Sequence, residues 1–123
     1  MTMPQTVVVF YAERNAAPFL SWMDRLDPPV QDKLIARIEL LEARGHELRR
    51  PHADTLRDGI HELRVVSQRV NYRVLYFFQG QVAVISHGLT KEKAVPREIE
   101  LAVERRRRHA AAPEKYRYRE ERG

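Results

Sequence analysis

The stretch that decides the fold reads IHELRVV at residues 60–66, VNYRVLYFF at 70–78 and VAVISHG at 82–88. β-Branched and aromatic residues are concentrated in these three runs, and turn-forming residues separate them. The pattern predicts three consecutive β-strands joined by hairpins.

The hairpin loops set the register of these strands. We expect two-residue loops at 67–68 and 79–80, which would place Glu62 opposite Arg73. Because side chains alternate across a strand, the polar residues then share one face. These are Glu62, Arg64, Asn71, Arg73 and Ser86. The apolar residues share the other face, and a β-bulge would reverse part of this assignment.

Two arginines interrupt the strand pattern. Burying a guanidinium costs several kcal/mol unless it is paired, so Arg64 and Arg73 need a carboxylate partner, a solvent-facing side or an anionic ligand. This requirement is the first indication of function.

The segment before these runs predicts one further strand and two helices. VVVFY at residues 7–11 is typical of a short strand. A helix capped by Asn15 follows, and Asp27 begins a second helix that ends near Gly45. Because these helices are so tightly joined, we expect a helical hairpin on one face of the sheet.

Residues 46–58 are loop-like, and Pro96 begins a last helix. The predicted order is β-α-α-β-β-β-α, an α+β fold with a mainly antiparallel sheet. We expect a single domain over residues 1–109 and a charged, mobile tail over 110–123.

Composition narrows the class of protein. The 123 residues contain no cysteine, which excludes disulfides and thiolate metal sites. No stretch is typical of a signal peptide or a membrane span, so we expect a cytoplasmic protein that makes no membrane contact. Residues 1–56 carry 7 Lys/Arg against 8 Asp/Glu (net −1), and residues 57–123 carry 15 against 9 (net +6). The basic half favours an anionic partner such as nucleic acid, although a basic surface also aids solubility.

Three motifs resemble those of a known family. LRDGIHELRV at residues 56–65 is similar to the LRDGLWELR segment of phage-derived, HigB-like toxins in the RelE/ParE superfamily. RVLYFF at 73–78 matches a strand of that family, and HGLTKEK at 87–93 with PREI at 96–99 resembles its HGFxKK…PxxEI ending. The resemblance spans roughly residues 5–109 and departs from the family pattern at Leu89 and Glu92.

The resemblance implies a RelE/ParE-like fold and the toxin of a type II toxin–antitoxin module. Such toxins cut messenger RNA on the ribosome without metal or cofactor, and we expect products with 2′,3′-cyclic phosphate and 5′-OH ends. The implied partners are a helix-turn-helix antitoxin, the ribosome and mRNA, and operator DNA through the antitoxin complex only. Two alternatives stay open: a ParE-like inhibitor of DNA gyrase, and an inactive phage-derived RNA-binding or adaptor module.

Metal-independent RNA cleavage needs a base, an acid and cations that stabilise the phosphorane. Arg64 and Arg73 suit the last task, because a guanidinium can hold two phosphate oxygens. The alternative is a purely structural Glu62–Arg73 ion pair. His87 is the candidate for proton transfer. However, our register places it on the apolar face, where a histidine is more often simply packed.

The remaining candidates are weaker. Lys91 and Lys93 could hold RNA backbone, and Glu62 could act as a base or, as we favour, orient Arg73. The RRRR run at 105–108 fits RNA phosphate or a solvated helix end equally well. The other histidines, His46, His52, His61 and His109, lack a metal-ligand spacing, so we assign no metal.

Overall fold

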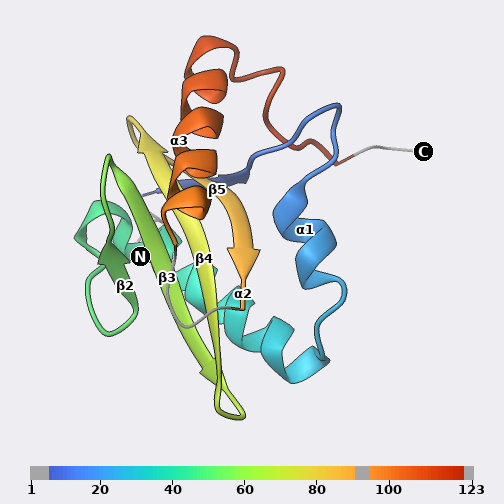
Figure 1. Cartoon of the computed structure of the whole chain (residues 1–123), viewed down its shortest axis with the longest axis vertical. Coiled ribbons are helices and arrows are strands. Elements are labelled where there is room, and N and C mark those ends of the chain that lie inside the picture. Colours follow the sequence, from blue (N-terminus) through green and yellow to red (C-terminus); the bar gives the residue numbers. More distant parts are fainter. Residues whose placement is uncertain (1–5, 91–94, 121–123) are drawn as a thin grey trace.

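The computed structural model describes residues 6–90 and 95–120, which form an α+β fold around a five-stranded sheet of order β1-β5-β4-β3-β2 (Figure 1). The elements in chain order are β1 (Val7–Phe10), α1 (Pro18–Met23), α2 (Pro28–Arg44), the 3-10 turn η1 (Gly45–Glu47), β2 (Ala53–Thr55), β3 (Ile60–Ser67), β4 (Val70–Gln79), β5 (Val82–Leu89) and α3 (Pro96–Ala111). The predicted α+β order is therefore confirmed, with one additional strand. That strand, β2, lies within the segment expected to be loop.

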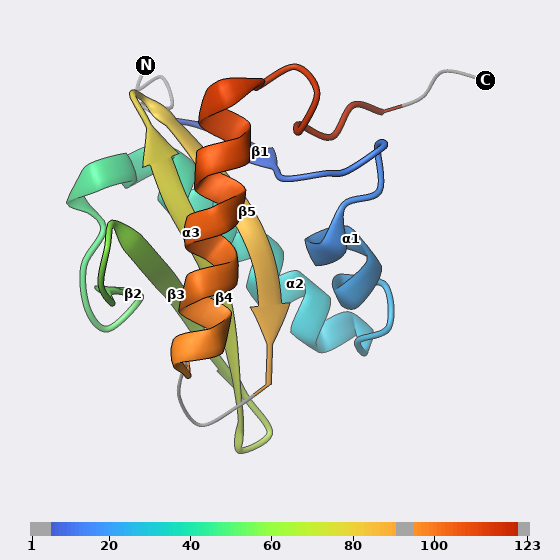
Figure 2. The same cartoon turned by 45° about the horizontal axis from the view of Figure 1, so that its top comes forward.

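Helices cover both faces of the sheet (Figure 2). Helices α1 and α2 pack on the face that carries Leu63, Val74 and Ile85, as the predicted helical hairpin requires. Helix α3 packs on the opposite face. We expected that face to gather charge, but much of it is a second apolar core. This core consists of Tyr11, Ile60, Leu75, Phe77, Val84, Leu89, Ile99 and Ala102.

The β3–β4 loop lies one residue later than expected. It is formed by Gln68 and Arg69, whose φ values of 50° and 67° are those that a two-residue type I′ turn requires. Arg64 therefore lies opposite Arg73, and Asn71 opposite Val66. Moving the loop by one residue changes the pairing by two, so the predicted faces of these strands are retained.

The β4–β5 hairpin contains the bulge that reverses one prediction. Its loop is Gly80-Gln81, and the register shifts between Leu75 and Tyr76, where Ser86 is the extra residue of β5. His87 consequently pairs with Leu75 and faces α3, not the apolar α1–α2 side to which our register assigned it.

Residues 116–119 of the C-terminal segment lie beside the end of β1 and the residues that follow it. Asn15 does not cap α1, whose N-cap is Ala17; its side chain instead donates to the Arg119 carbonyl at 2.7 Å and accepts from the Arg119 N–H at 2.8 Å. Tyr118 N–H also donates to the Phe10 carbonyl at 2.8 Å. The described part of the charged tail thus pairs with the β1 segment, while its mobility stays a prediction. Across residues 6–90 and 95–120, no helix has the length and apolar character to cross a membrane.

Candidate functional site

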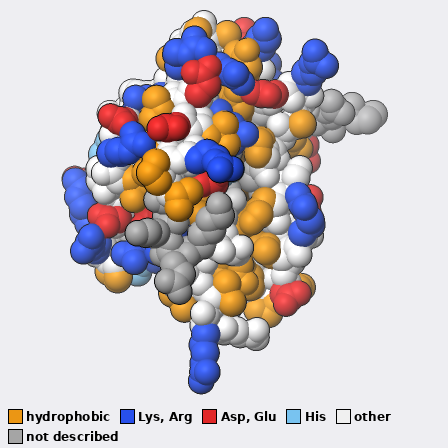
Figure 3. Space-filling model, viewed as in Figure 1, with side chains coloured by type: hydrophobic (Ala, Val, Ile, Leu, Met, Phe, Trp, Pro, Cys, Tyr) orange, Lys and Arg blue, Asp and Glu red, His pale blue; other side chains and the backbone are white. Residues whose placement is uncertain are grey.

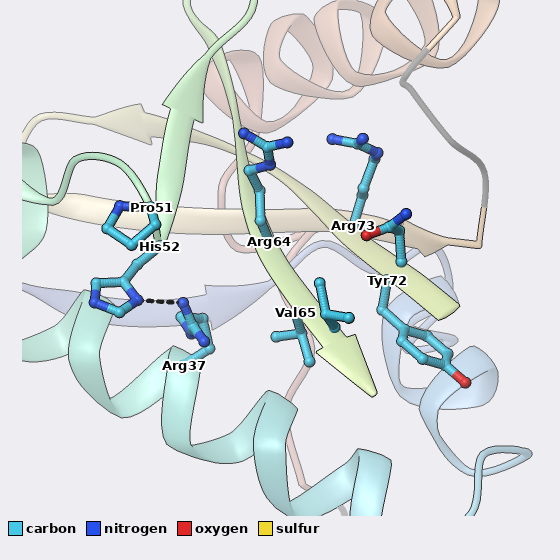
Figure 4. Close-up of a pocket in the computed structure, with 9 residues that line it drawn as sticks. Arg37, Pro51, His52, Arg64, Val65, Tyr72 and Arg73 are labelled. Carbon is cyan, nitrogen blue, oxygen red and sulfur yellow. Dashed lines mark hydrogen bonds between the residues drawn. The ribbon is translucent and has the colours of Figure 1, made fainter. Parts of the chain in front are cut away.

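Two arginines face each other directly in the β3–β4 ladder. Arg64 and Arg73 are cross-strand partners, and their side chains leave the sheet on the same side (Figure 4). Directly opposed residues have Cβ atoms about 5 Å apart, and like charges placed there are destabilising unless an anion compensates them.

One buried carboxylate serves both guanidinium groups. Arg73 Nη1 donates to Glu62 Oε1 at 2.6 Å, and Arg64 Nε lies 3.9 Å from the same oxygen. The side chains of Glu62 and Arg73 are 4% and 9% exposed, whereas that of Arg64 is 40% exposed. The second oxygen, Glu62 Oε2, is buried without a hydrogen-bond partner among the described residues.

These contacts show that the two arginines, which the sequence analysis assigned to the same task, differ in burial and pairing. Arg73 forms the Glu62 ion pair that we had kept as its structural alternative, and it is nearly buried. Arg64 keeps its guanidinium open to solvent while sharing that carboxylate only at long range. Arg64 is therefore the arginine of the pair that is better placed to meet a large external ligand.

A pocket of about 450 Å³ opens just before the start of β2, where the edge of β3 beyond Leu63 has no β2 partner. Figure 4 shows Arg64 and Arg73 on one side of it and Arg37 and His52 on the other. Its lining residues are Arg37, Pro51, His52, Arg64, Val65, Val66, Asn71, Tyr72 and Arg73. Three arginines and an exposed asparagine therefore border one pocket, a surface suited to an anion.

His87 is held beside this cluster by a short polar network. Its Nδ1 lies 2.8 Å from Ser86 Oγ, and its Nε2 lies 3.3 Å from Glu98 Oε2 in the first turn of α3. Arg105 Nη1 lies 3.3 Å from Ser86 Oγ. Arg73 pairs with Leu89, so His87, two residues before Leu89, is the diagonal neighbour of Arg73 on the same face. The backbones of diagonal neighbours are about 7–8 Å apart. The bulge therefore brings the His87 side chain to the same side of the sheet as the arginine pair.

Ser86 and Glu98 contact His87, and Arg105 contacts Ser86; the sequence did not predict these contacts. Their role depends on the bulge and on α3 covering this face, neither of which has a local sequence signal. The guanidinium of Arg105 lies over the Tyr11 ring at 5.1 Å, and burial lowers its pKa.

The rest of the arginine run at 105–108 is engaged with protein groups. Arg106 donates to the Asp58 carbonyl, Arg107 pairs with Glu104, and Arg108 pairs with Glu13 at 2.6 Å. Figure 3 shows Lys and Arg side chains interspersed with Asp and Glu on this side of the molecule. These contacts favour a structural role over a free cationic patch.

Lys91 and Lys93, proposed from the sequence as substrate contacts, lie outside the described residues. No group of three or more His, Asp and Glu side chains within residues 6–90 and 95–120 is arranged to hold a metal ion.

Comparison with protein families gives a match over most of the chain. A protein-family model described as phage derived protein Gp49-like (DUF891) matches residues 21–107, which are 87 of the 123 residues. The matched segment contains Arg37, Glu62, Arg64, Arg73 and His87. A search of curated proteins finds no match.

Proposed function

This chain belongs to the phage-derived Gp49-like family, and we propose that it is the toxin of a type II toxin–antitoxin module, a HigB-like endoribonuclease that cuts messenger RNA on the ribosome. The proposal is supported by the family, by the α+β fold, and by the sequence resemblance across residues 56–99. Its partners would be a helix-turn-helix antitoxin, the ribosome with its mRNA, and operator DNA through the antitoxin complex.

The observation that carries the proposal is the directly opposed Arg64–Arg73 pair, in which Arg73 is held by Glu62 and Arg64 stays open to solvent. The Arg64 side chain is 40% exposed at the border of an open pocket, and its guanidinium reaches Glu62 only at 3.9 Å. A phosphodiester is an anion whose oxygens match the forked geometry of the Arg64 guanidinium. The charge on those oxygens increases in the phosphorane, so the cluster stabilises the transition state more than the substrate.

The residues then divide the reaction as follows. The 2′-oxygen of RNA attacks phosphorus and loses its proton, the bond from phosphorus to the 5′-oxygen breaks, and the leaving oxygen gains a proton. Arg64 contacts the phosphorane oxygens. Arg73 holds Glu62 in place and adds positive charge from its nearly buried position next to Arg64. His87 either accepts the proton that the 2′-oxygen loses or donates the proton that the 5′-oxygen gains. Glu98 lies beside the His87 ring and stabilises its charged form. Lys91 and Lys93 would hold the flanking RNA backbone.

The proposal is tested with translating ribosomes and the purified chain, which is treated with EDTA and dialysed beforehand to remove any bound metal. Primer extension should locate new mRNA breaks, and end analysis should find 2′,3′-cyclic phosphate and 5′-OH termini. Replacing His87 by Gln should slow the cutting at least 100-fold, as loss of a general acid or base does.

Intact transcripts would reject the nuclease. If supercoiling by DNA gyrase is then blocked by the same protein, the chain is a gyrase inhibitor. If growth also continues when the chain is expressed without an antitoxin, it is an inactive RNA-binding or adaptor module.

A further inference from the structure

Arg37 of α2 is a partly buried cation at the far side of the pocket from Arg73. Its Nη1 donates a hydrogen bond to His52 Nδ1 (Figure 4). Among the ion pairs formed by the described residues, none includes Arg37. Burial lowers the pKa of this guanidinium. A partly desolvated cation with a neutral partner favours an external anion.

His52 connects Arg37 to the arginine pair. Its backbone carbonyl accepts the Arg64 N–H at 2.9 Å, and its side chain accepts from Arg37. Because a guanidinium can only donate, His52 Nδ1 is the acceptor in this contact. One residue thus fixes Arg37 relative to Arg64 across the uncovered edge of β3.

We propose that Arg37 forms a second phosphate-binding subsite, which holds a backbone phosphate of the same RNA strand next to the one that Arg64 contacts. His52 is its positioning residue. The inference rests on the proposed function and adds the path of the substrate, which crosses the edge of β3 just before the start of β2. Both arginines border one continuous pocket, so successive phosphates of a single strand can engage them together.

The test uses a short RNA oligonucleotide with 2′-O-methyl groups, which binds but cannot be cleaved through its 2′-oxygens. Its affinity for the full chain is measured by fluorescence anisotropy at several salt concentrations. Arg37→Gln should weaken binding about 5- to 10-fold and reduce the slope of log K against log salt by about 0.7, the loss of one phosphate contact on a single strand. The matched control is Arg25→Gln, which changes an exposed arginine that donates to the Ser21 carbonyl and does not line the pocket. This variant should bind as the wild type does.

Variants of His52 separate positioning from a general structural effect. His52→Asn keeps an acceptor near the place of Nδ1 and should retain most of the affinity. His52→Leu removes the acceptor and should weaken binding as Arg37→Gln does. Circular dichroism of each variant should match that of the wild type.

The inference is overturned if Arg37→Gln keeps the wild-type affinity and salt slope, or if the wild-type chain does not bind the oligonucleotide. It is also overturned if Arg37→Gln weakens binding to an acidic peptide while RNA binding is unchanged, because the site would then serve a protein. If the variant loses RNA affinity but the wild type cuts no transcripts, the subsite stands and the nuclease falls. If the wild type cuts transcripts and the variant binds RNA normally, the nuclease is supported and the subsite is rejected.

Discussion

Removing Arg73 should destabilise the fold strongly, because Glu62 would be left as a buried charge. The two side chains are 9% and 4% exposed and meet at 2.6 Å. For charge centres about 4 Å apart and an effective dielectric constant of about 20, the lost attraction is about 4 kcal/mol. This agrees with the roughly 3–5 kcal/mol lost when one partner of a buried pair is removed. We therefore expect Arg73→Met to lower the free energy of unfolding by about 3–5 kcal/mol.

Urea denaturation measures this loss directly. The control is Arg57→Met, which removes the exposed partner of Asp58 and should cost less than about 1 kcal/mol. Combining Arg73→Met with Glu62→Leu should recover most of the stability, since no buried charge then remains. A loss below about 1 kcal/mol for Arg73→Met alone would refute the reasoning. The expected loss also means that reduced RNA cleavage by an Arg73 variant would not by itself identify a catalytic role.

Three further predictions follow from individual contacts. Burial lowers the pKa of His109 to about 4, so the unfolded chain binds a proton below pH 6.5 that the fold excludes. The free energy of unfolding should therefore fall by up to about 3 kcal/mol from pH 6.5 to 4, and urea titrations of His109→Gln should show a shallower fall; equal slopes would contradict this. Replacing Gln68 and Arg69, both at positive φ, by Asn and Gly should stabilise the hairpin by about 1–2 kcal/mol, and an unchanged urea midpoint would argue against the turn. Gly88→Ala would place a Cβ 2.3 Å from the Trp22 ring and should cost about 1–3 kcal/mol in thermal unfolding, whereas an unchanged Tm would show that this packing is wrong.

The central sheet could be predicted because its signals are local. Strands β3, β4 and β5 have runs of β-branched and aromatic residues, and glycine marks one hairpin. Strand β2 could not be predicted, because three residues with the sequence ADT become a strand only by pairing with β3. The cover provided by α3 was missed for a related reason. The arginines led us to predict a charged face, whereas Leu75, Phe77 and Val84 form an apolar core on it.

The candidate site was predicted in part. The shared face of Glu62, Arg64 and Arg73 survived a shifted loop, because the shift moved the pairing by an even number of residues. The bulge at Ser86 moved His87 by an odd step and so reversed its face. Glu98 and the Arg37–His52 contact arise from packing between distant segments, which hydrophobic periodicity does not encode.

The rate at which Arg64→Gln cuts ribosome-bound mRNA tests the central claim most directly. Arg64 is exposed and shares its carboxylate only at 3.9 Å, so this variant should keep the stability of the wild type. If the arginine pair stabilises the phosphorane, the cleavage rate should fall by about 10²- to 10³-fold, while Arg25→Gln cuts normally. Cleavage by Arg64→Gln at the wild-type rate would contradict the account.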